Sequence, residues 1–235
     1  MEKAILINRI EDFKHLNKRY SRIYLGNEFC PRLLPLKKEL KEIIDIVRKS
    51  KFNFTFLTSQ LDSIGFKNVE RIVRQLDKEQ LLEEIVVNDY GLLYYIRKNF
   101  PDCQIILGRM LSRFLTLYKE SFFRQIGIKR LEFDSLEGIK KNKADEISYY
   151  YPYSFFSVTR YCPVANIDKN KSKNHGIINC SKECLKIGQL SVDSNIFART
   201  AILKGNAQFI RNRVIFKTLV KKGVDRLIFQ PHVPL

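Results

Sequence analysis

Apolar residues along the chain form eight short runs, and amphipathic stretches lie between most of them. The runs are AILIN (4–8), RIYLG (22–26), FNFTFLTS (52–59), LEEIVVND (82–89), QIILG (104–108), RLEFD (130–134), EISYYYPY (146–153) and DRLIFQP (225–231). Runs that are continuously apolar, rather than alternating, are typical of parallel strands covered on both faces. Eight strand signals in series predict a TIM-type (β/α)8 barrel. A doubly wound open sheet is the competing fold, but no Gly-x-Gly-x-x-Gly turn follows the first strand.

The stretches between the strands repeat their apolar residues with the period of a helix. In 36–50 the apolar positions share one face and are Leu36, Leu40, Ile43, Ile44 and Val47. We expect further helices over 68–80, 92–100, 111–127 and 208–223. Gly127 and Gly223 follow the last turn of two of these helices and are predicted to end them.

The length of 235 residues predicts one barrel domain over 1–235. Residues 162–205 show no clear period, and we expect them to form an irregular insertion after the seventh strand. About 190 residues then remain for the eight strand–helix units, slightly below the usual minimum of about 200 for this fold. The barrel is therefore expected to be short or partly incomplete.

Basic residues outnumber acidic ones, and the formal net charge is +17. A charge of this size favours partners with phosphates or carboxylates, including RNA. The aromatic run 148–161 would suit stacking on RNA bases, or would pack against the insertion. The lysines are scattered, so compositional bias is the alternative explanation of the charge. No apolar run reaches the roughly 18–20 residues of a membrane-spanning helix, and the first residues lack a signal-peptide pattern, so we expect a cytoplasmic protein.

Four of the five cysteines have a spacing that suits a soft metal site. Cys162, Cys180 and Cys184 form a Cys-x17-Cys-x3-Cys group, and Cys30 lies far upstream. In a reducing compartment such cysteines bind metal or do chemistry more often than they form disulfides. Four thiolates suit an iron–sulfur cluster or zinc. Zinc sites usually contain two close pairs and this chain has one, but a structural zinc stays an alternative. Cys103 is isolated in the sequence and is expected to be a buried structural thiol.

The barrel also predicts where the chemistry lies, because active sites of this fold lie at the C-terminal ends of the strands. Cys30 follows the second strand and Cys162 follows the seventh, so both are expected at the same rim. The other candidates at this rim are Glu28, Asp89, Arg109, Arg160 and His232.

Each of these five candidates has a functional and a structural interpretation. Arg109 and Arg160 could clamp a carboxylate or phosphate, or could form structural salt bridges. Glu28 and Asp89 could do acid–base chemistry, or could cap helices. His232 could act as an acid or base near neutral pH, or could simply be exposed. No Ser-His-Asp or Cys-His arrangement can be assembled from neighbouring signals, so the catalytic residues stay unassigned and a hydrolase has little support.

Several segments resemble the collagenase-like U32 family, peptidases of unknown type. RIYLGNEFCPR is similar to that family's VYLGE-x-C-x-R, and YYYPYSFFSVTRYCPVA resembles its PLA-x-S-x-RC hallmark. INCSKECLKIG resembles the Cys-x3-Cys loop that follows, and VVNDYGLL, LKGNAQF and VDRLIFQPHVP resemble further segments. The likeness is closest to the short, single-barrel UbiV type of ubiquinone biosynthesis. The chain departs from the family pattern at two points. It has SFFSVTRYC where the family has the PLA-x-S-x-RC hallmark, and it has YYYPY where the family often has a serine-tyrosine-glycine-histidine stretch.

The resemblance implies a barrel with a [4Fe-4S] cluster on Cys30, Cys162, Cys180 and Cys184. It also implies a part in oxygen-independent hydroxylation of ubiquinone precursors, together with a related, UbiU-like family subunit. Prephenate is the implied oxygen donor, and Arg109 and Arg160 would be plausible clamps for its two carboxylates. Other members hydroxylate bases of tRNA or ribosomal RNA, which is the second hypothesis. The third is a non-enzymatic interaction module held together by zinc. Peptidase activity is not expected, despite the family label.

Overall fold

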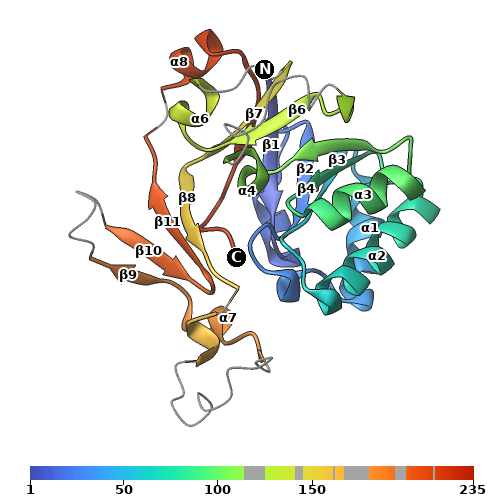
Figure 1. The fold of residues 1–235 in the computed structure, drawn as a ribbon, viewed down its shortest axis with the longest axis horizontal. Coiled ribbons are helices and arrows are strands. Elements are labelled where there is room, and N and C mark those ends of the chain that lie inside the picture. The colour runs from blue at the N-terminus through green and yellow to red at the C-terminus, as the bar shows by residue number, and fades with distance from the viewer. Residues whose placement is uncertain (114–124, 141–144, 161, 167–179, 194–199, 214) are drawn as a thin grey trace.

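The computed structural model describes residues 1–113, 125–140, 145–160, 162–166, 180–193, 200–213 and 215–235 (Figure 1). Eight parallel strands in these segments close into a barrel in the order β1-β12-β7-β6-β5-β4-β3-β2. They are β1 (Glu2–Ile7), β2 (Arg22–Gly26), β3 (Asn53–Leu57), β4 (Glu84–Val87), β5 (Gln104–Leu107), β6 (Arg130–Phe133), β7 (Glu146–Tyr151) and β12 (Val224–Phe229). Each strand falls on one of the eight apolar runs, so the predicted barrel is confirmed.

Three long helices cover one side of the barrel, beside β2, β3 and β4 (Figure 1). They are α1 (Lys37–Lys49), α2 (Ser63–Lys78) and α3 (Tyr90–Asn99), and they match three of the predicted helices. The other helices described around the barrel are short: α4 (Arg109–Ser112), α6 (Leu136–Lys140) and α8 (Phe216–Lys221), with 3-10 turns η1 (Ile10–His15) and η2 (Pro31–Leu33). The predicted helix 111–127 starts within α4, and its residues 114–124 lie outside the described part of the chain.

The segment between β7 and β12 is larger and more regular than the predicted insertion 162–205. It contains an antiparallel sheet in the order β8-β11-β10-β9, which projects from the barrel in Figure 1. Its strands are β8 (Tyr153–Val158), β9 (Leu190–Val192), β10 (Ala201–Lys204) and β11 (Ala207–Arg211), accompanied by η4 (Val164–Asn166) and α7 (Glu183–Ile187). The predicted helix 208–223 is wrong in its first part, because residues 207–211 pair with β8 and β10 and only α8 is helical.

Three apolar cores hold these parts together. The largest lies between the barrel strands and the helices outside them, and a second fills the barrel interior with residues such as Tyr24 and Tyr150. The third joins the barrel to the antiparallel sheet and includes Phe29, Phe155 and Phe209. The ring of Phe29 lies 5.3 Å from that of Phe155 and 5.1 Å from that of Phe209, measured between centroids. The insertion is therefore packed against the barrel end.

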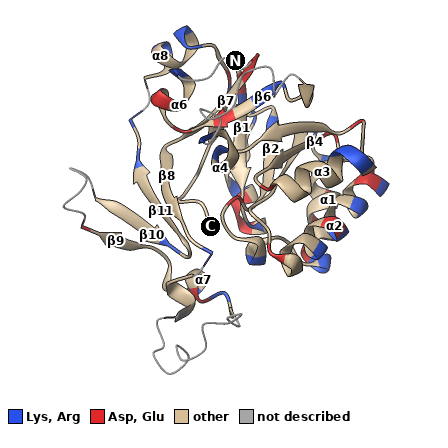
Figure 2. Cartoon of the chain, viewed as in Figure 1, with Lys and Arg blue, Asp and Glu red and all other residues tan. Residues whose placement is uncertain are grey.

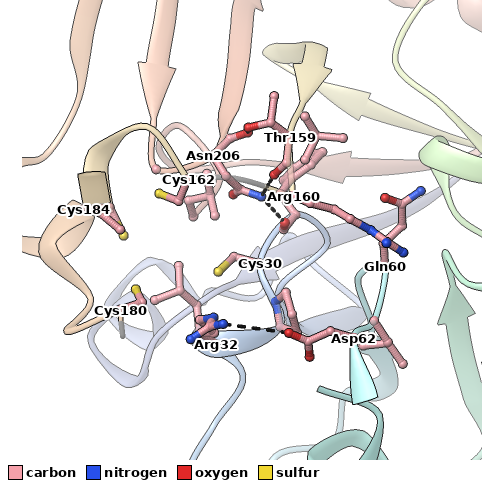
Figure 3. Close-up of a pocket in the computed structure, with 18 of the residues that line it drawn as sticks. Cys30, Arg32, Gln60, Asp62, Thr159, Arg160, Cys162, Cys180, Cys184 and Asn206 are labelled. Carbon is pink, nitrogen blue, oxygen red and sulfur yellow. Dashed lines mark hydrogen bonds and ion pairs between the residues drawn. The ribbon is translucent and has the colours of Figure 1, made fainter. Parts of the chain in front are cut away.

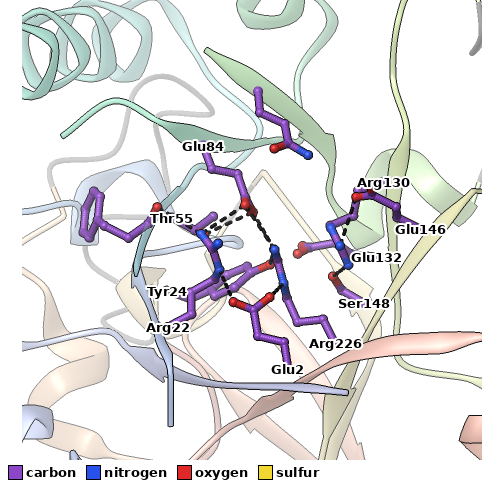
Figure 4. Close-up of polar contacts among 12 residues, drawn as sticks. Glu2, Arg22, Tyr24, Thr55, Glu84, Arg130, Glu132, Glu146, Ser148 and Arg226 are labelled. Carbon is purple, nitrogen blue, oxygen red and sulfur yellow. Dashed lines mark hydrogen bonds and ion pairs between the residues drawn. The ribbon is translucent and has the colours of Figure 1, made fainter. Parts of the chain in front are cut away.

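The N-terminal end of the barrel is closed by buried ion pairs (Figure 4). Arg226 on β12 pairs with Glu2 and Glu84, and Arg22 on β2 pairs with the same two carboxylates, at 2.8 Å and 3.0 Å. Arg226 also donates a hydrogen bond to the Tyr24 hydroxyl at 2.7 Å. In barrels of this type that end contributes to stability rather than to chemistry.

Basic residues are spread over several elements, including α1, α2, α3 and α8 (Figure 2). This distribution resembles the scattered pattern seen in the sequence. None of the described helices is both long enough and apolar enough to span a membrane.

Candidate four-thiol site

Four cysteines line one cavity between the end of β2, the start of α2 and the insertion (Figure 3). The cavity has a volume of about 370 Å³, and its wall includes Cys30, Cys162, Cys180 and Cys184. Among the residues that the structure describes, no three His, Cys, Asp or Glu side chains are close enough to hold one metal ion together. The thiols thus surround a space rather than meet at a point.

The loop after β2 holds Cys30 in place. A Cβ on Gly26 would lie 2.0 Å from the carbonyl oxygen of Leu57, and its φ of +137° favours glycine, so the chain can turn here only without a side chain. Asn27 then accepts a hydrogen bond from the Cys30 N–H at 2.8 Å through its side-chain oxygen. Pro31 begins the 3-10 turn η2 directly after Cys30. The first thiol is therefore fixed to the barrel itself.

The other three thiols belong to the insertion. Cys162 precedes η4, and Cys184 lies buried within α7. The N–H of Lys182 donates to the sulfur of Cys180 at 3.4 Å. A Cβ on Gly205, in the turn between β10 and β11, would lie 3.7 Å from the sulfur of Cys184. The hairpin turn thus packs closely against this thiol.

The surroundings of the thiols contain donors that suit bound thiolates. Burial raises the pKa of Cys30 to about 11 and also raises the pKa values of Cys162 and Cys184, so proton loss has to accompany metal binding. The backbone N–H groups of Arg32 and Ala165 hydrogen-bond to the sulfurs of Cys30 and Cys162 and oppose this shift. Soft sulfur ligands with N–H donors around them are what an iron–sulfur cluster requires. The donor set therefore fits the group that the resemblance implies.

The cavity wall contains polar residues beyond the predicted set. Arg32 forms an ion pair with Asp62 at 3.8 Å, and Gln60 lies nearby (Figure 3). Asn206 donates to the carbonyl oxygens of Phe29 at 2.8 Å and of Thr159 at 2.9 Å. Two of these positions carry a sequence signal: Arg32 follows Cys30 by two residues, and Gly-Asn at 205–206 is a typical two-residue hairpin turn.

Arg109 and Arg160 have different environments. Arg160 lines the cavity, as a substrate clamp would. The side chain of Arg109 is 1% exposed and pairs with Glu28, whose Oε2 accepts from Nε at 2.9 Å, and with Asp134 at 3.1 Å. Its guanidinium also lies 3.9 Å from the centre of the Tyr150 ring. Arg109 is therefore in the structural salt-bridge arrangement, and so is its partner Glu28.

The two remaining rim candidates also have structural contacts. Asp89 caps α3, because its Oδ1 accepts from the N–H of Leu92 at 3.0 Å. The Nε2 atom of His232 lies 3.5 Å from Asp12. Burial lowers the pKa of His232 to about 4, so the ring is neutral at pH 7 and is not poised for proton transfer there. Neither residue is part of the cavity wall.

The aromatic run 148–161 is mostly buried in the part that the structure describes. Tyr149 and Tyr150 belong to the barrel, and Phe155 packs in the core between barrel and sheet. Phe156 is 40% exposed, and Tyr161 lies outside the described residues. Burial in the barrel and against the insertion therefore accounts for most of the described residues of this run, and base stacking on RNA stays a prediction.

The fold and the cavity define a class: a closed (β/α)8-type barrel with a four-thiol cavity beside its C-terminal end. No protein-family model matches the sequence, and no curated protein matches it. Among solved structures, the U32 peptidase Mk0906 matches at 12% identity with a TM-score of 0.57, covering 100% of this chain and 94% of that one. A family 18 N-acetylglucosaminidase from Paenibacillus barengoltzii matches at 8% identity and a TM-score of 0.49, over 97% of this chain and 94% of that one. At these identities the likeness shows the fold alone.

Proposed function

We propose that this chain is a U32-type iron–sulfur protein that holds a 4Fe–4S cluster on Cys30, Cys162, Cys180 and Cys184. The observation that carries the proposal is their convergence: four of the five cysteines, from distant parts of the sequence, line one cavity. The fifth, Cys103, is buried beside β5, outside that cavity wall.

Two features support a cluster over zinc. The four thiols line a cavity of about 370 Å³, and among the described residues no three of them are close enough to hold one metal ion, whereas zinc at about 2.3 Å from each sulfur draws its four ligands to one point. The ligands also include only one close pair, Cys180 and Cys184, rather than the two close pairs of a typical structural zinc site. A bound cluster would supply one-electron transfer, and the residues of this chain would hold it, shield it from water and bind the substrate beside it.

The finer role that we infer is a UbiV-like part in oxygen-independent hydroxylation of a ubiquinone precursor, with a related UbiU-like subunit as partner. It is supported by the resemblance of the cysteine-containing segments and by the polar residues of the cavity. Arg160 offers positive charge in the cavity wall, where an anionic substrate such as prephenate would need it. Arg109 is not part of this role, because its guanidinium is committed to Glu28 and Asp134.

The proposal is tested by measuring iron, sulfide and zinc in protein purified without oxygen. About four irons and four sulfides per chain are expected, with the broad visible absorption of a cluster. Cys30→Ser and Cys184→Ser should lose most of this iron, whereas Cys103→Ser is the matched control and should keep it. Stoichiometric zinc with little iron would refute the cluster and leave a structural metal site. Full iron content in Cys30→Ser would refute the four-ligand assignment.

A further inference from the structure

One asparagine side chain in the cavity wall links two of the segments that contain the thiols. The Nδ2 atom of Asn206 donates to the carbonyl oxygen of Phe29 at 2.8 Å and to that of Thr159 at 2.9 Å (Figure 3). Phe29 directly precedes Cys30 in the loop after β2, and Thr159 lies shortly before Cys162. The two acceptors are 177 and 47 residues from Asn206 in the sequence, so a single amide joins the barrel loop to the insertion.

The turn that contains Asn206 also contacts a third thiol. Gly205 and Asn206 connect β10 to β11, and a Cβ on Gly205 would lie 3.7 Å from the sulfur of Cys184. The backbone carbonyl of Asn206 accepts from the N–H of Thr159 at 2.9 Å, which fixes this turn to the segment before Cys162. Three of the four thiol-containing segments therefore meet at Asn206.

The two donated bonds decide how the amide of Asn206 is oriented. An asparagine has two N–H donors, and both acceptors here are main-chain carbonyls. Its Oδ1 atom is buried and has no hydrogen-bond partner among the described residues, which costs free energy. The reversed amide would direct Oδ1 at the two carbonyl oxygens and lose both bonds. The side chain is thus committed to joining these segments.

We propose that Asn206 is a positioning residue of the four-thiol site, which fixes the loop of Cys30 to the segment of Cys162 and to the turn beside Cys184. The inference rests on the proposed function. The barrel supplies Cys30 and the insertion supplies the other three thiols, so the geometry of the site depends on how these two parts are joined beside the cavity. Without the amide, the third apolar core still joins the barrel to the sheet, but the Cys30 loop is held less tightly. A cluster with four protein ligands needs all four thiolates at once, so a looser loop speeds its loss.

Asn212, at the other end of β11, offers a matched control. Its Nδ2 atom donates to the carbonyl oxygen of Asp134 at 3.2 Å and to the Ser154 hydroxyl at 2.8 Å, so it also ties the insertion to the barrel. Its Oδ1 atom is likewise buried without a hydrogen-bond partner among the described residues. Asn212 is not part of the cavity wall. Loss of either amide therefore removes similar contacts, but only Asn206 lies beside the thiols.

The test compares anaerobically purified wild type with Asn206→Ala, Asn206→Leu, Asn212→Ala and Asn212→Leu. Ala removes the amide without adding bulk, and Leu keeps the size of the side chain. Iron release to an excess of chelator is followed through the visible absorption of the cluster, and urea unfolding is measured in parallel. Both Asn206 variants should release iron about tenfold faster than wild type, which corresponds to about 1.4 kcal/mol of activation free energy. The Asn212 variants should unfold at similarly lowered urea concentrations but release iron less than twofold faster.

Each outcome decides the inference. Asn206 variants that fold but retain no iron, beside Asn212 variants that retain it, would also support the inference. Equal release rates in the Asn206 and Asn212 variants would overturn it and leave the proposed function standing. Asn206 variants that fail to fold while the Asn212 variants fold would assign the residue to general stability and overturn it, and so would faster release in only one Asn206 variant, which would trace the effect to the new side chain. A wild type without iron and sulfide refutes the proposed function, and this inference falls with it.

Discussion

A buried carboxyl group in the barrel interior should make the stability of this protein fall as the pH rises. Glu132 on β6 is fully buried, and its Oε2 accepts a hydrogen bond from the Tyr150 hydroxyl at 2.8 Å. Its other oxygen has no hydrogen-bond partner among the described residues. Burial raises the pKa of Glu132 to about 8, and the negative charge of Glu28 adds to the shift. The informative perturbation is Glu132→Gln, which keeps the shape and removes the titration.

The magnitude follows from the difference between the folded and unfolded pKa values. An unfolded glutamate has a pKa of about 4.3, so between pH 4.3 and pH 8 the folded state binds one more proton than the unfolded state. The free energy of unfolding therefore falls as the pH rises through this window. A pKa difference of about 3.7 corresponds to a loss of about 5 kcal/mol, complete above pH 8. Below pH 4.3 the group imposes no such cost.

The assay is urea unfolding of wild type and Glu132→Gln at intervals from pH 5 to pH 9. At pH 5 the variant should be equal to the wild type or about 1 kcal/mol less stable, since an amide nitrogen then replaces an oxygen without a partner. At pH 9 the variant should be more stable by several kcal/mol. All other titrating groups are common to both proteins, so the difference between the two curves isolates Glu132.

A difference that stays constant from pH 5 to pH 9 would refute this reasoning, because Glu132 would then titrate alike in the folded and unfolded states. The control is Glu42→Gln, at an exposed position of α1. This variant should follow the wild-type curve throughout. A Glu42→Gln protein with the same pH-dependent gain would show that the gain reflects net charge rather than the buried site.

Three further predictions concern the site and its support. Arg109→Met should lower the free energy of unfolding by about 3–5 kcal/mol in urea titrations, since it leaves Glu28 buried without its ion-pair partner and removes one of the two arginines paired with Asp134, whereas Arg160→Met should change it by less than about 0.5 kcal/mol; equal effects would contradict the assigned environments. Gly205→Ala should lower the free energy of unfolding by about 1–2 kcal/mol in urea titrations, because φ is +56° there; a stability equal to that of the wild type would contradict this. Iron uptake by the apoprotein should become tighter from pH 6 to pH 9, because the pKa of Cys30 is raised to about 11 and binding releases its proton; pH-independent uptake would contradict this.

The barrel could be predicted because its strands are encoded locally. Each barrel strand is a continuous apolar run, and each long helix has a clear apolar face, so neither depends on knowing its neighbours. Closure could not be predicted, since it requires β1 to pair with β12, which lies more than 200 residues later in the chain. The antiparallel sheet was missed because β8 follows β7 after one residue and because β9 and β10 have only three and four residues. Gly205–Asn206 was the local signal that pointed to the hairpin of β10 and β11.

The same distinction between local and long-range information decides which parts of the candidate site could be predicted. The four cysteines could be grouped from type and spacing, and their common cavity agrees with that grouping. The buried ion pairs of Arg109 could not be predicted from the sequence, because its partners Glu28 and Asp134 lie 81 and 25 residues away.

The position of the cavity follows from how the barrel mouth is filled. Arg109 lies over Tyr150 of the barrel interior, and Phe29 and Phe155 pack above it, so protein occupies the place where this fold commonly binds substrate. The cavity lies instead to the side, between the loop after β2 and the insertion. Arg113 couples the two parts, because its guanidinium pairs with Asp134, donates to the Phe155 carbonyl and lies 3.5 Å from the centre of the Phe155 ring. Since the barrel supplies one thiol and the insertion three, the site is complete only when the sheet is docked, and the packing that fills the barrel mouth is what brings the four thiols together.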